Sequence, residues 1–369
     1  MAFNLDWKMG FEVELVAPRG QSRRDLAKKI ATNCDGTAVP FFHPQSEPSD
    51  APGRPTFENL TLAFKVCDQA GSPIASFVDD LTLQADMDKR KPPLAGWYRI
   101  IADDARILRL VMRHCDAAMP HTQLLDPLAD LFGTQPQTHE GGLVRVVDDR
   151  KISVAIAAPL PGERERPCEI VTAPIEVNHE EALTALLDQA GAMGFYVPVE
   201  GATHIHFDAS ALCSAPVIAR LVAVFERFGD SLKKSVGVNP NCVRLGAWPD
   251  RLRELTGSTE FQAMDWPKTQ ESLAKLSLSK YCDFNLLNIA HNNAEKHTFE
   301  VRILPATLDA NFILEAAELF QGILKWCCDL TSGARSLPES FNALIDQLPF
   351  AEQSRAQWKE RASRNEFLG

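Results

Sequence analysis

Hydrophobic and polar residues alternate in several short segments of the chain, and this pattern predicts β-strands with one apolar and one polar face. The clearest segment reads Thr-His-Ile-His-Phe-Asp, in which His204, His206 and Asp208 share a face opposite two apolar residues. Two imidazoles and a carboxylate on one face are suitable ligands for a divalent metal. A single strand of this kind more often only turns its polar face to water, so the metal interpretation depends on other segments.

Two distant segments show the same design. Near the N-terminus Glu12 and Glu14 alternate with apolar residues, and late in the chain Glu300 and Arg302 do the same. Ordinary solvent-facing strands favour Thr, Lys, Ser and Gln, so three faces made of Glu, His and Arg indicate one shared site. Arg302 suits the neutralisation of a phosphoryl group. The candidate ligands suit Mg²⁺ or Mn²⁺ and are Glu12, Glu14, His204, His206 and Glu300.

Helical periodicity separates these strands, which is typical of a mixed α+β fold. We predict strands over residues 10–15, 60–68, 76–83, 143–147, 152–157, 203–208, 280–289 and 297–303. We predict helices over residues 103–119, 178–191, 214–229 and 312–330, and an irregular loop over 43–55. Because no long linker or internal repeat divides the chain, we expect one large domain in residues 1–330 and a polar helical tail in 331–369.

A dense run of charges, Gly-Glu-Arg-Glu-Arg-Pro, precedes a short apolar strand near residue 170. Arg164 and Arg166 suit charge-assisted bonds to phosphate oxygens, and Glu169 suits a metal cluster. The same run is equally typical of a solvated loop with internal salt bridges. The residues alone leave both interpretations open.

Composition limits the partners and the compartment. The 369 residues include 38 Lys and Arg against 49 Asp and Glu, a net charge of −11 that disfavours general nucleic-acid binding. The N-terminus lacks the pattern of a secretory signal, and no apolar run is long enough to span a membrane. Nine scattered cysteines without paired C-x-x-C spacing favour reduced thiols and therefore a cytoplasmic protein.

Several short motifs occur in a specific order along the chain. The three main ones are G-F-E-V-E-L at 10–15, H-I-H-F-D at 204–208 and H-T-F-E-V-R at 297–302. The supporting ones are C-E-I-V-T-A-P-I at 168–175, N-P-N-C at 239–242, K-Y-C-D-F-N at 280–285 and T-L-D at 307–309. The ordered set resembles the amidoligase family, which belongs to the carboxylate–amine ligase superfamily together with glutamine synthetase and glutamate–cysteine ligase.

This resemblance implies a glutamine synthetase-like fold, a curved, mainly antiparallel sheet with helices packed on its convex side. It implies two or three Mg²⁺ or Mn²⁺ ions held by Glu12, Glu14, Glu169, Glu300 and His204 or His206. We expect nucleotide contacts from His206, Asn285, Arg244 and Arg302, and catalytic roles for Glu300, Arg302, Arg164 and Arg166. The segment 60–150 is longer than the family leads us to expect, so residues 54–150 are a candidate substrate-specific elaboration.

The activity that the resemblance implies is ATP-dependent formation of an amide bond. ATP would phosphorylate a substrate carboxylate, and an amine would then attack the acyl phosphate. The substrates would be small-molecule or peptide carboxylates and amines, and the family allows a homo-oligomer. Two alternatives stay open: a Zn²⁺-dependent hydrolase that uses the His204/His206 pair, and a non-catalytic relative that binds a nucleotide or an acidic peptide.

Overall fold

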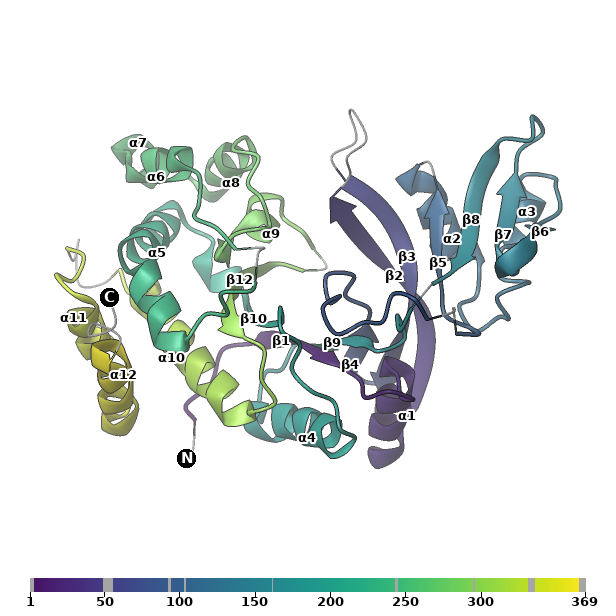
Figure 1. Ribbon diagram of the computed structural model, residues 1–369. Helices are drawn as coiled ribbons and strands as arrows, with labels where there is room; N and C mark the ends of the chain where they lie inside the picture. Colours follow the sequence, from purple (N-terminus) through teal and green to yellow (C-terminus); the bar gives the residue numbers. More distant parts are fainter. Residues whose placement is uncertain are drawn as a thin grey trace. The chain divides into compact units, whose positions relative to one another are not determined.

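The computed structural model contains helices and antiparallel strands, arranged in two compact units (Figure 1). It describes residues 3–48, 56–91, 94–102, 104–160, 162–242, 245–294, 296–330 and 336–364. Unit 1 comprises Met1–Val13, Pro174–Leu187 and Glu200–Gly369, and unit 2 comprises Glu14–Ala173 and Asp188–Val199. The mixed helix and antiparallel strand content is confirmed, whereas the glutamine synthetase-like arrangement and the single domain over residues 1–330 stay predictions. None of the helices in the described ranges combines the length and apolar character that a membrane crossing needs.

Unit 1 is built on strands in the order β11-β12-β10-β1, and each neighbouring pair is antiparallel. These strands are β1 (Met9–Val16, as far as Val13 in this unit), β10 (Ala202–Asp208), β11 (Phe284–Asn285) and β12 (Thr298–Pro305). The alternation of polar and apolar residues therefore correctly predicted β1, β10 and β12.

The strand register in unit 1 brings the polar positions together. Glu12 lies opposite His204 between β1 and β10, and His206 lies opposite Glu300 between β10 and β12. Asn285 on β11 lies opposite the other side of Glu300. Because side chains that are directly opposite on paired strands share a face, this register gathers acids, imidazoles and an amide on one face.

The apolar face of the same strands packs against aromatic residues of unit 1. The ring centroid of Phe225 lies 4.3 Å from that of Phe284, 5.3 Å from that of Phe299 and 6.3 Å from that of Phe320. The long helices that contribute to this core are α5 (Ala215–Val236) and α10 (Ala310–Cys328). Burial of these rings fixes the strand orientation and so turns the polar face away from the core.

The ends of these helices follow local side-chain chemistry. The side chains of Ser214 and Asp309 accept hydrogen bonds from the first amides of α5 and α10, as expected for N-cap residues. Helix α5 runs past the predicted end at residue 229 because Leu232 and Val236 are also buried, and it ends at Gly237 in the left-handed conformation. The other helices with residues in unit 1 are α4 (His179–Ala192), η2 (Ser210–Leu212), α6 (Asp250–Gly257), α7 (Thr259–Gln262), α8 (Trp266–Ala274), α9 (Leu287–Ala290), α11 (Phe341–Gln347) and α12 (Glu352–Arg364).

Unit 2 has its own antiparallel strands in the order β9-β4-β3-β5-β8-β7-β6, and β2 pairs with β3 in addition. The strands are β2 (Thr37–Pro48), β3 (Thr56–Cys67), β4 (Pro73–Val78), β5 (Tyr98–Ala102), β6 (Gln137–Thr138), β7 (Val144–Val147), β8 (Ser153–Pro159) and β9 (Pro167–Thr172). The helices are α1 (Arg23–Asn33), α2 (Ala105–His114), α3 (Asp126–Leu131) and η1 (Glu140–Gly142). A hydrophobic core that includes Leu60, Ile100, Val111, Leu128 and Val144 joins strands to helices. The strands predicted over 60–68, 143–147 and 152–157 are confirmed as β3, β7 and β8, whereas the strand predicted over 76–83 overlaps β4 only at residues 76–78.

The predicted loop over residues 43–55 is wrong for residues 43–48, which continue β2, while residues 49–55 lie outside the described residues. Strand β2 pairs along its whole length with β3, from Thr37 opposite Cys67 to Pro48 opposite Thr56. Proline lacks an amide hydrogen but is tolerated in a strand that has a partner on one side only.

Two other predicted elements are shorter than expected. Only Phe284–Asn285 of the predicted strand 280–289 is a strand, because the Asn285 side chain accepts a hydrogen bond from the Leu287 amide at 2.8 Å and the chain turns into α9. The helix predicted over 103–119 is described from Ala105, after its N-cap Asp104, and ends at His114.

Candidate metal centre

Three strands of unit 1 each contribute one potential metal ligand to a common centre. Ligand atoms of Glu12 on β1, His204 on β10 and Glu300 on β12 all lie within 4.8 Å of one another. Nδ1 of His204 lies 3.1 Å from Oε2 of Glu12 and 3.5 Å from Oε1 of Glu300. The imidazole therefore stands between two carboxylates that are 288 positions apart in the chain.

The second histidine lies beside the same carboxylates. Nε2 of His206 is 3.1 Å from Oε1 of Glu12 and 3.7 Å from Oε1 of Glu300. Its other ring nitrogen, Nδ1, is 3.1 Å from Oγ1 of Thr298. The hydroxyl of Thr298 thus orients His206 toward the two acids, in the way that outer groups orient ring nitrogens at metal sites.

Two cations and an amide hold the carboxylates. Lys296 Nζ donates to Oε1 of Glu12 at 2.6 Å, and a guanidinium nitrogen of Arg302 donates to Oε1 of Glu300 at 2.5 Å. Nδ2 of Asn285 donates to Oε2 of Glu300 at 2.7 Å. Because the Leu287 amide fixes the Asn285 carbonyl oxygen, the amide nitrogen points toward Glu300.

Burial and neighbouring charge set the protonation of the centre. Burial raises the pKa of Glu300, but His206, Arg302 and His204 lower it further, and the result is about 2. Burial likewise opposes ionisation of Glu12, yet His206, Lys296 and hydrogen bonds from the histidines hold its pKa well below the usual range. Burial and the Arg302 charge lower the pKa of His204. Near neutral pH the centre therefore offers two ionised carboxylates and a neutral imidazole.

This donor set fits a divalent ion of the Mg²⁺ or Mn²⁺ type. Carboxylate oxygens are the ligands that hard cations prefer, and a neutral imidazole is a ligand that Mn²⁺ accepts. All three residues are at most 9% exposed, so water competes poorly for the carboxylates. Glu12, His204 and Glu300 are therefore the residues that would hold a metal in unit 1.

Three predicted residues lie elsewhere or outside the described part. Glu14 and Glu169 belong to unit 2, where their carboxylate oxygens lie within 4.8 Å of each other. Their predicted role as ligands of a further ion stays a prediction. Arg244, a predicted nucleotide contact, lies outside the described residues. Asp208, on the same face of β10 as the histidines, accepts a hydrogen bond from the Ser210 amide at 3.0 Å and so shapes the turn after the strand.

Arg164 and Arg166 lie in a charged network inside unit 2. Arg164 donates to Asp79 Oδ1 at 2.7 Å and to the backbone carbonyls of Leu83 and Asp80, at 2.9 Å each. Arg166 forms an ion pair with Glu163 and donates to the Ala17 carbonyl at 2.8 Å. One of the two interpretations left open was a solvated loop with internal salt bridges; the run does contain the ion pair between Arg166 and Glu163, but both residues are buried. The phosphate-binding roles of both arginines stay predictions.

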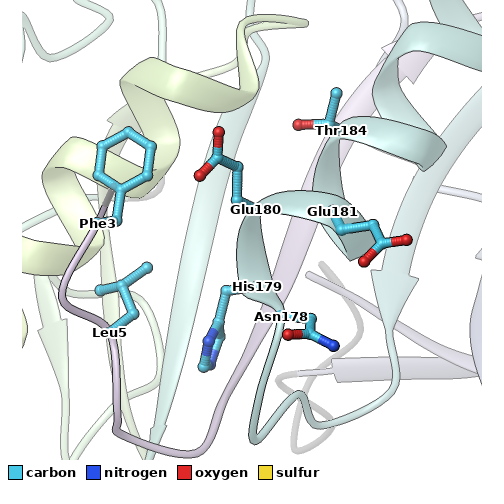
Figure 2. Close-up of a pocket in the computed structure, with 7 residues that line it drawn as sticks. All are labelled: Phe3, Leu5, Asn178, His179, Glu180, Glu181 and Thr184. Atoms are coloured by element: carbon cyan, nitrogen blue, oxygen red, sulfur yellow. The ribbon is translucent and has the colours of Figure 1, made fainter. Parts of the chain in front are cut away.

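A surface hollow of about 530 Å³ also lies in unit 1, at the start of α4 (Figure 2). Figure 2 shows Phe3 and Leu5 of the N-terminal segment facing His179 and Glu180. Nε2 of His179 lies 3.1 Å from the Trp7 carbonyl oxygen, so this buried imidazole ties the N-terminal segment to α4. The hollow contains none of the predicted site residues.

Sequence reasoning missed two residues of the centre. Lys296 lies two positions before β12, and Thr298 is the first residue of that strand. Thr298 alternates with Phe299 and belongs to the same polar face as Glu300, so the period of two could have identified it. No such pattern identifies Lys296, because this residue precedes the strand and so lies outside its alternation of polar and apolar positions.

Comparison with known proteins adds to this geometry. A family model described as "Putative amidoligase enzyme" matches residues 5–324, most of the 369-residue chain. The chain belongs to the amidoligase family. The match confirms the family that the ordered motifs resemble, and it spans Glu12, His204 and Glu300 together with Lys296 and Arg302. A search of curated proteins found no match. The family name denotes enzymes that form amide bonds, so membership identifies the amidoligase as a ligase at this coarse level.

Proposed function

We propose that this amidoligase is an ATP- and divalent-metal-dependent carboxylate–amine ligase. The observation that carries the proposal is the group formed by Glu12, His204 and Glu300, flanked by the cations Lys296 and Arg302. Ionised acids suited to a metal, next to basic groups suited to phosphate, are what phosphoryl transfer to a carboxylate requires. Family membership supplies the reaction class, and the centre supplies the chemistry.

In this proposal Glu12, His204 and Glu300 would hold the ion. A divalent ion held by these residues would supply positive charge that offsets the repulsion between the triphosphate and a substrate carboxylate. Asn285 keeps Glu300 oriented through Oε2, so that Oε1 faces the centre where Arg302 and the two histidines lie. This preorganisation lowers the cost of arranging charges during the reaction.

The proposed reaction has two steps. A substrate carboxylate oxygen attacks the γ-phosphorus of ATP, which breaks the bond to ADP and gives an acyl phosphate. An amine nitrogen then attacks the acyl carbon, phosphate leaves, and the nitrogen loses a proton to water, which completes the amide. Arg302, 11% exposed and always charged, would stabilise the negative charge of the phosphoryl group in transfer. Neither step requires a Ser or Cys nucleophile.

The two alternative functions predict either a different set of metal ligands or a different result in an activity assay. A zinc hydrolase that used the His204/His206 pair would need both imidazoles as ligands, whereas the three-residue group within unit 1 contains one imidazole and two carboxylates. A non-catalytic relative would bind nucleotide without releasing phosphate. The hydrolase would contain zinc and act without ATP. An assay of amine-dependent phosphate release from ATP therefore distinguishes the ligase from both alternatives.

The proposal is tested with the purified full chain, Mg²⁺, ATP and pooled amino acids, amines and short peptides. We expect phosphate release that depends on an added amine, and we expect Glu300→Gln and His204→Ala each to reduce it more than about 100-fold, since removal of a metal ligand costs at least as much as removal of its outer support. Glu226→Gln, on the exposed face of α5, is the matched control and should retain activity. Absence of nucleotide binding with both Mg²⁺ and Mn²⁺ would refute the proposal.

A further inference from the structure

Lys296 places a half-exposed ammonium group on a carboxylate that is a candidate metal ligand. Its Nζ lies 2.6 Å from Oε1 of Glu12, and the same oxygen is 3.1 Å from Nε2 of His206. The Lys296 side chain is 45% exposed, whereas that of Glu12 is 11% exposed. One charged partner of this pair is thus buried, and the other reaches it from the protein surface.

We infer that Lys296 is an exchangeable cation of the centre: it neutralises Glu12 when no metal is bound, leaves that carboxylate when a divalent ion binds, and then contacts the nucleotide phosphates. The inference rests on the proposed function, because it requires the metal centre of unit 1. It adds a residue with a defined role that neither the sequence motifs nor the family match assigns.

The charges of the centre give the first argument. The structure matches each buried acid with one cation, Lys296 with Glu12 and Arg302 with Glu300. A divalent ion would add two positive charges to a group in which each of these two acids already has a cationic partner. Since an ammonium and a metal ion compete for the same carboxylate oxygen and repel each other, metal binding favours departure of one of the two resident cations.

The mobility of the two cations decides which one leaves. Arg302 lies within β12, is 11% exposed, and its backbone amide donates to the Asp283 carbonyl at 3.0 Å. Lys296 precedes that strand by two positions, is 45% exposed, and its flexible stem reaches the centre from solvent. If Lys296 leaves Glu12, its ammonium group becomes hydrated, which costs little free energy. If Arg302 left Glu300, contacts that are shielded from water would have to break.

The backbone keeps Lys296 close to the centre after it leaves Glu12. The Lys296 amide donates to the Asn293 carbonyl at 3.2 Å, and the Thr298 amide donates to the Lys296 carbonyl at 3.0 Å. These two hydrogen bonds hold the backbone of Lys296 next to the start of β12. With Glu12 occupied by metal, the ammonium would be available to the phosphates of bound ATP, and Lys is a common point-charge ligand of phosphate.

Titration of the full-length metal-free protein with Mn²⁺ alone tests the exchange. We expect Lys296→Met to bind Mn²⁺ roughly two- to fivefold more tightly than wild type, because a competing ion pair of this kind contributes about that much. Lys296→Arg keeps the positive charge and should bind close to wild type. Lys275→Met is the matched control, since Lys275 is 70% exposed and pairs with Glu271 on the surface of the same unit.

A second arm measures the contact with nucleotide. With saturating Mn²⁺, Lys296→Met should bind a non-hydrolysable ATP analogue several-fold more weakly than wild type, and Lys296→Arg should largely restore binding. Amine acetylation followed by mass spectrometry reports the exchange in the wild-type protein itself. Mg²⁺ should increase the reactivity of Lys296 relative to that of Lys275.

The outcomes separate this inference from the proposed function. If wild type binds Mn²⁺ and Lys296→Met binds it equally or more weakly, the inference is wrong while the metal centre stands. Unchanged acetylation of Lys296 in saturating Mg²⁺ would likewise overturn it. If wild type, Lys296→Met and Lys296→Arg all fail to bind Mn²⁺, the metal centre fails and the inference falls with it.

Discussion

Each unit of the molecule buries a cluster of charged side chains, and the two clusters differ in what their cations contact. In unit 1 the acids Glu12 and Glu300 converge with two imidazoles, and the cations each bond to one acid. In unit 2 the guanidinium groups of Arg23, Arg164 and Arg166 bond mainly to backbone carbonyls, and Asp79 and Glu163 complete the ion pairs.

This difference distinguishes a centre built to exchange partners from one built to hold the chain. Arg23 is fully buried, donates to the carbonyls of Leu62, Arg164 and Pro167, and lies 4.4 Å from the centroid of Trp97. A ligand cannot replace backbone carbonyls without opening the fold. Carboxylates and imidazoles, in contrast, can exchange an ammonium for a metal while the strands stay paired. The presence of a buried charged cluster therefore does not by itself indicate a functional site. The groups that its charged side chains contact are what distinguish the two cases.

The largest expected effect is on the stability of unit 2. Asp79→Ala leaves Arg164 and Arg23 without their buried acid, and we expect a loss of about 3–5 kcal/mol in the free energy of unfolding, measured by urea denaturation. Asp149→Ala, an exposed acid of the same unit, should change stability by less than about 0.5 kcal/mol. If Asp79→Ala retains wild-type stability but loses amide-forming activity, the difference drawn between the two clusters is wrong. That result would support the predicted phosphate-binding role of Arg164.

A smaller effect is expected at Asn285, which donates a hydrogen bond to Glu300 of the candidate metal centre. Asn285→Ala removes the bond that orients Glu300, and we expect Mn²⁺ affinity to fall roughly 10- to 100-fold, as is typical for groups that orient a ligand. Isothermal titration measures the affinity. Asn288→Ala, in the short helix that follows, serves as the control. If Asn285→Ala, Asn288→Ala and wild type bind Mn²⁺ with equal affinity, the bond from Asn285 to Glu300 does not contribute to metal binding.

The smallest effect concerns acid stability in unit 2. Burial raises the pKa of Glu163, but bonds from Lys91, Asp88 and Arg166 lower it further, from the usual 4.5 to about 2. As pH falls from 4.5 toward 2, the unfolded chain takes up this proton before the folded one does, so the stabilisation from Glu163 declines. Urea denaturation across this range should therefore give a shallower pH dependence for Glu163→Gln than for wild type. An unchanged slope would contradict the ion-pair account of this residue.

Much of the candidate metal centre could be predicted from sequence because strand alternation constrains which residues share a face. A period of two assigns Glu12, His204 and Glu300 to polar faces, and burial of Phe299 and Ile205 on the other face determines which way those faces turn. Alternation alone does not supply the strand order, since β1, β10 and β12 are separated by about 190 and 90 residues. The family resemblance supplied the expectation that they meet.

Other features depend on contacts that a linear pattern does not encode. Arg164 bonds to Leu83, 81 positions away, and Arg166 to Ala17, 149 positions away, so the buried network was indistinguishable from a solvated loop. The breaker residues of β2 hid a strand whose pairing with β3 outweighs local propensity. The contact of Lys296 with Glu12 could not be predicted, because Lys296 precedes β12 and no repeating pattern determines where its side chain points.

The central claim is that Glu12, His204 and Glu300 bind a divalent ion. The most direct test is anomalous diffraction from crystals of the full chain grown with Mn²⁺, compared with crystals of Glu300→Gln. We predict an anomalous peak in contact with these three side chains, with Lys296 displaced from Glu12, and loss of that peak in the variant. Wild-type crystals at saturating Mn²⁺ with no peak there, and Lys296 still bonded to Glu12, would contradict the account.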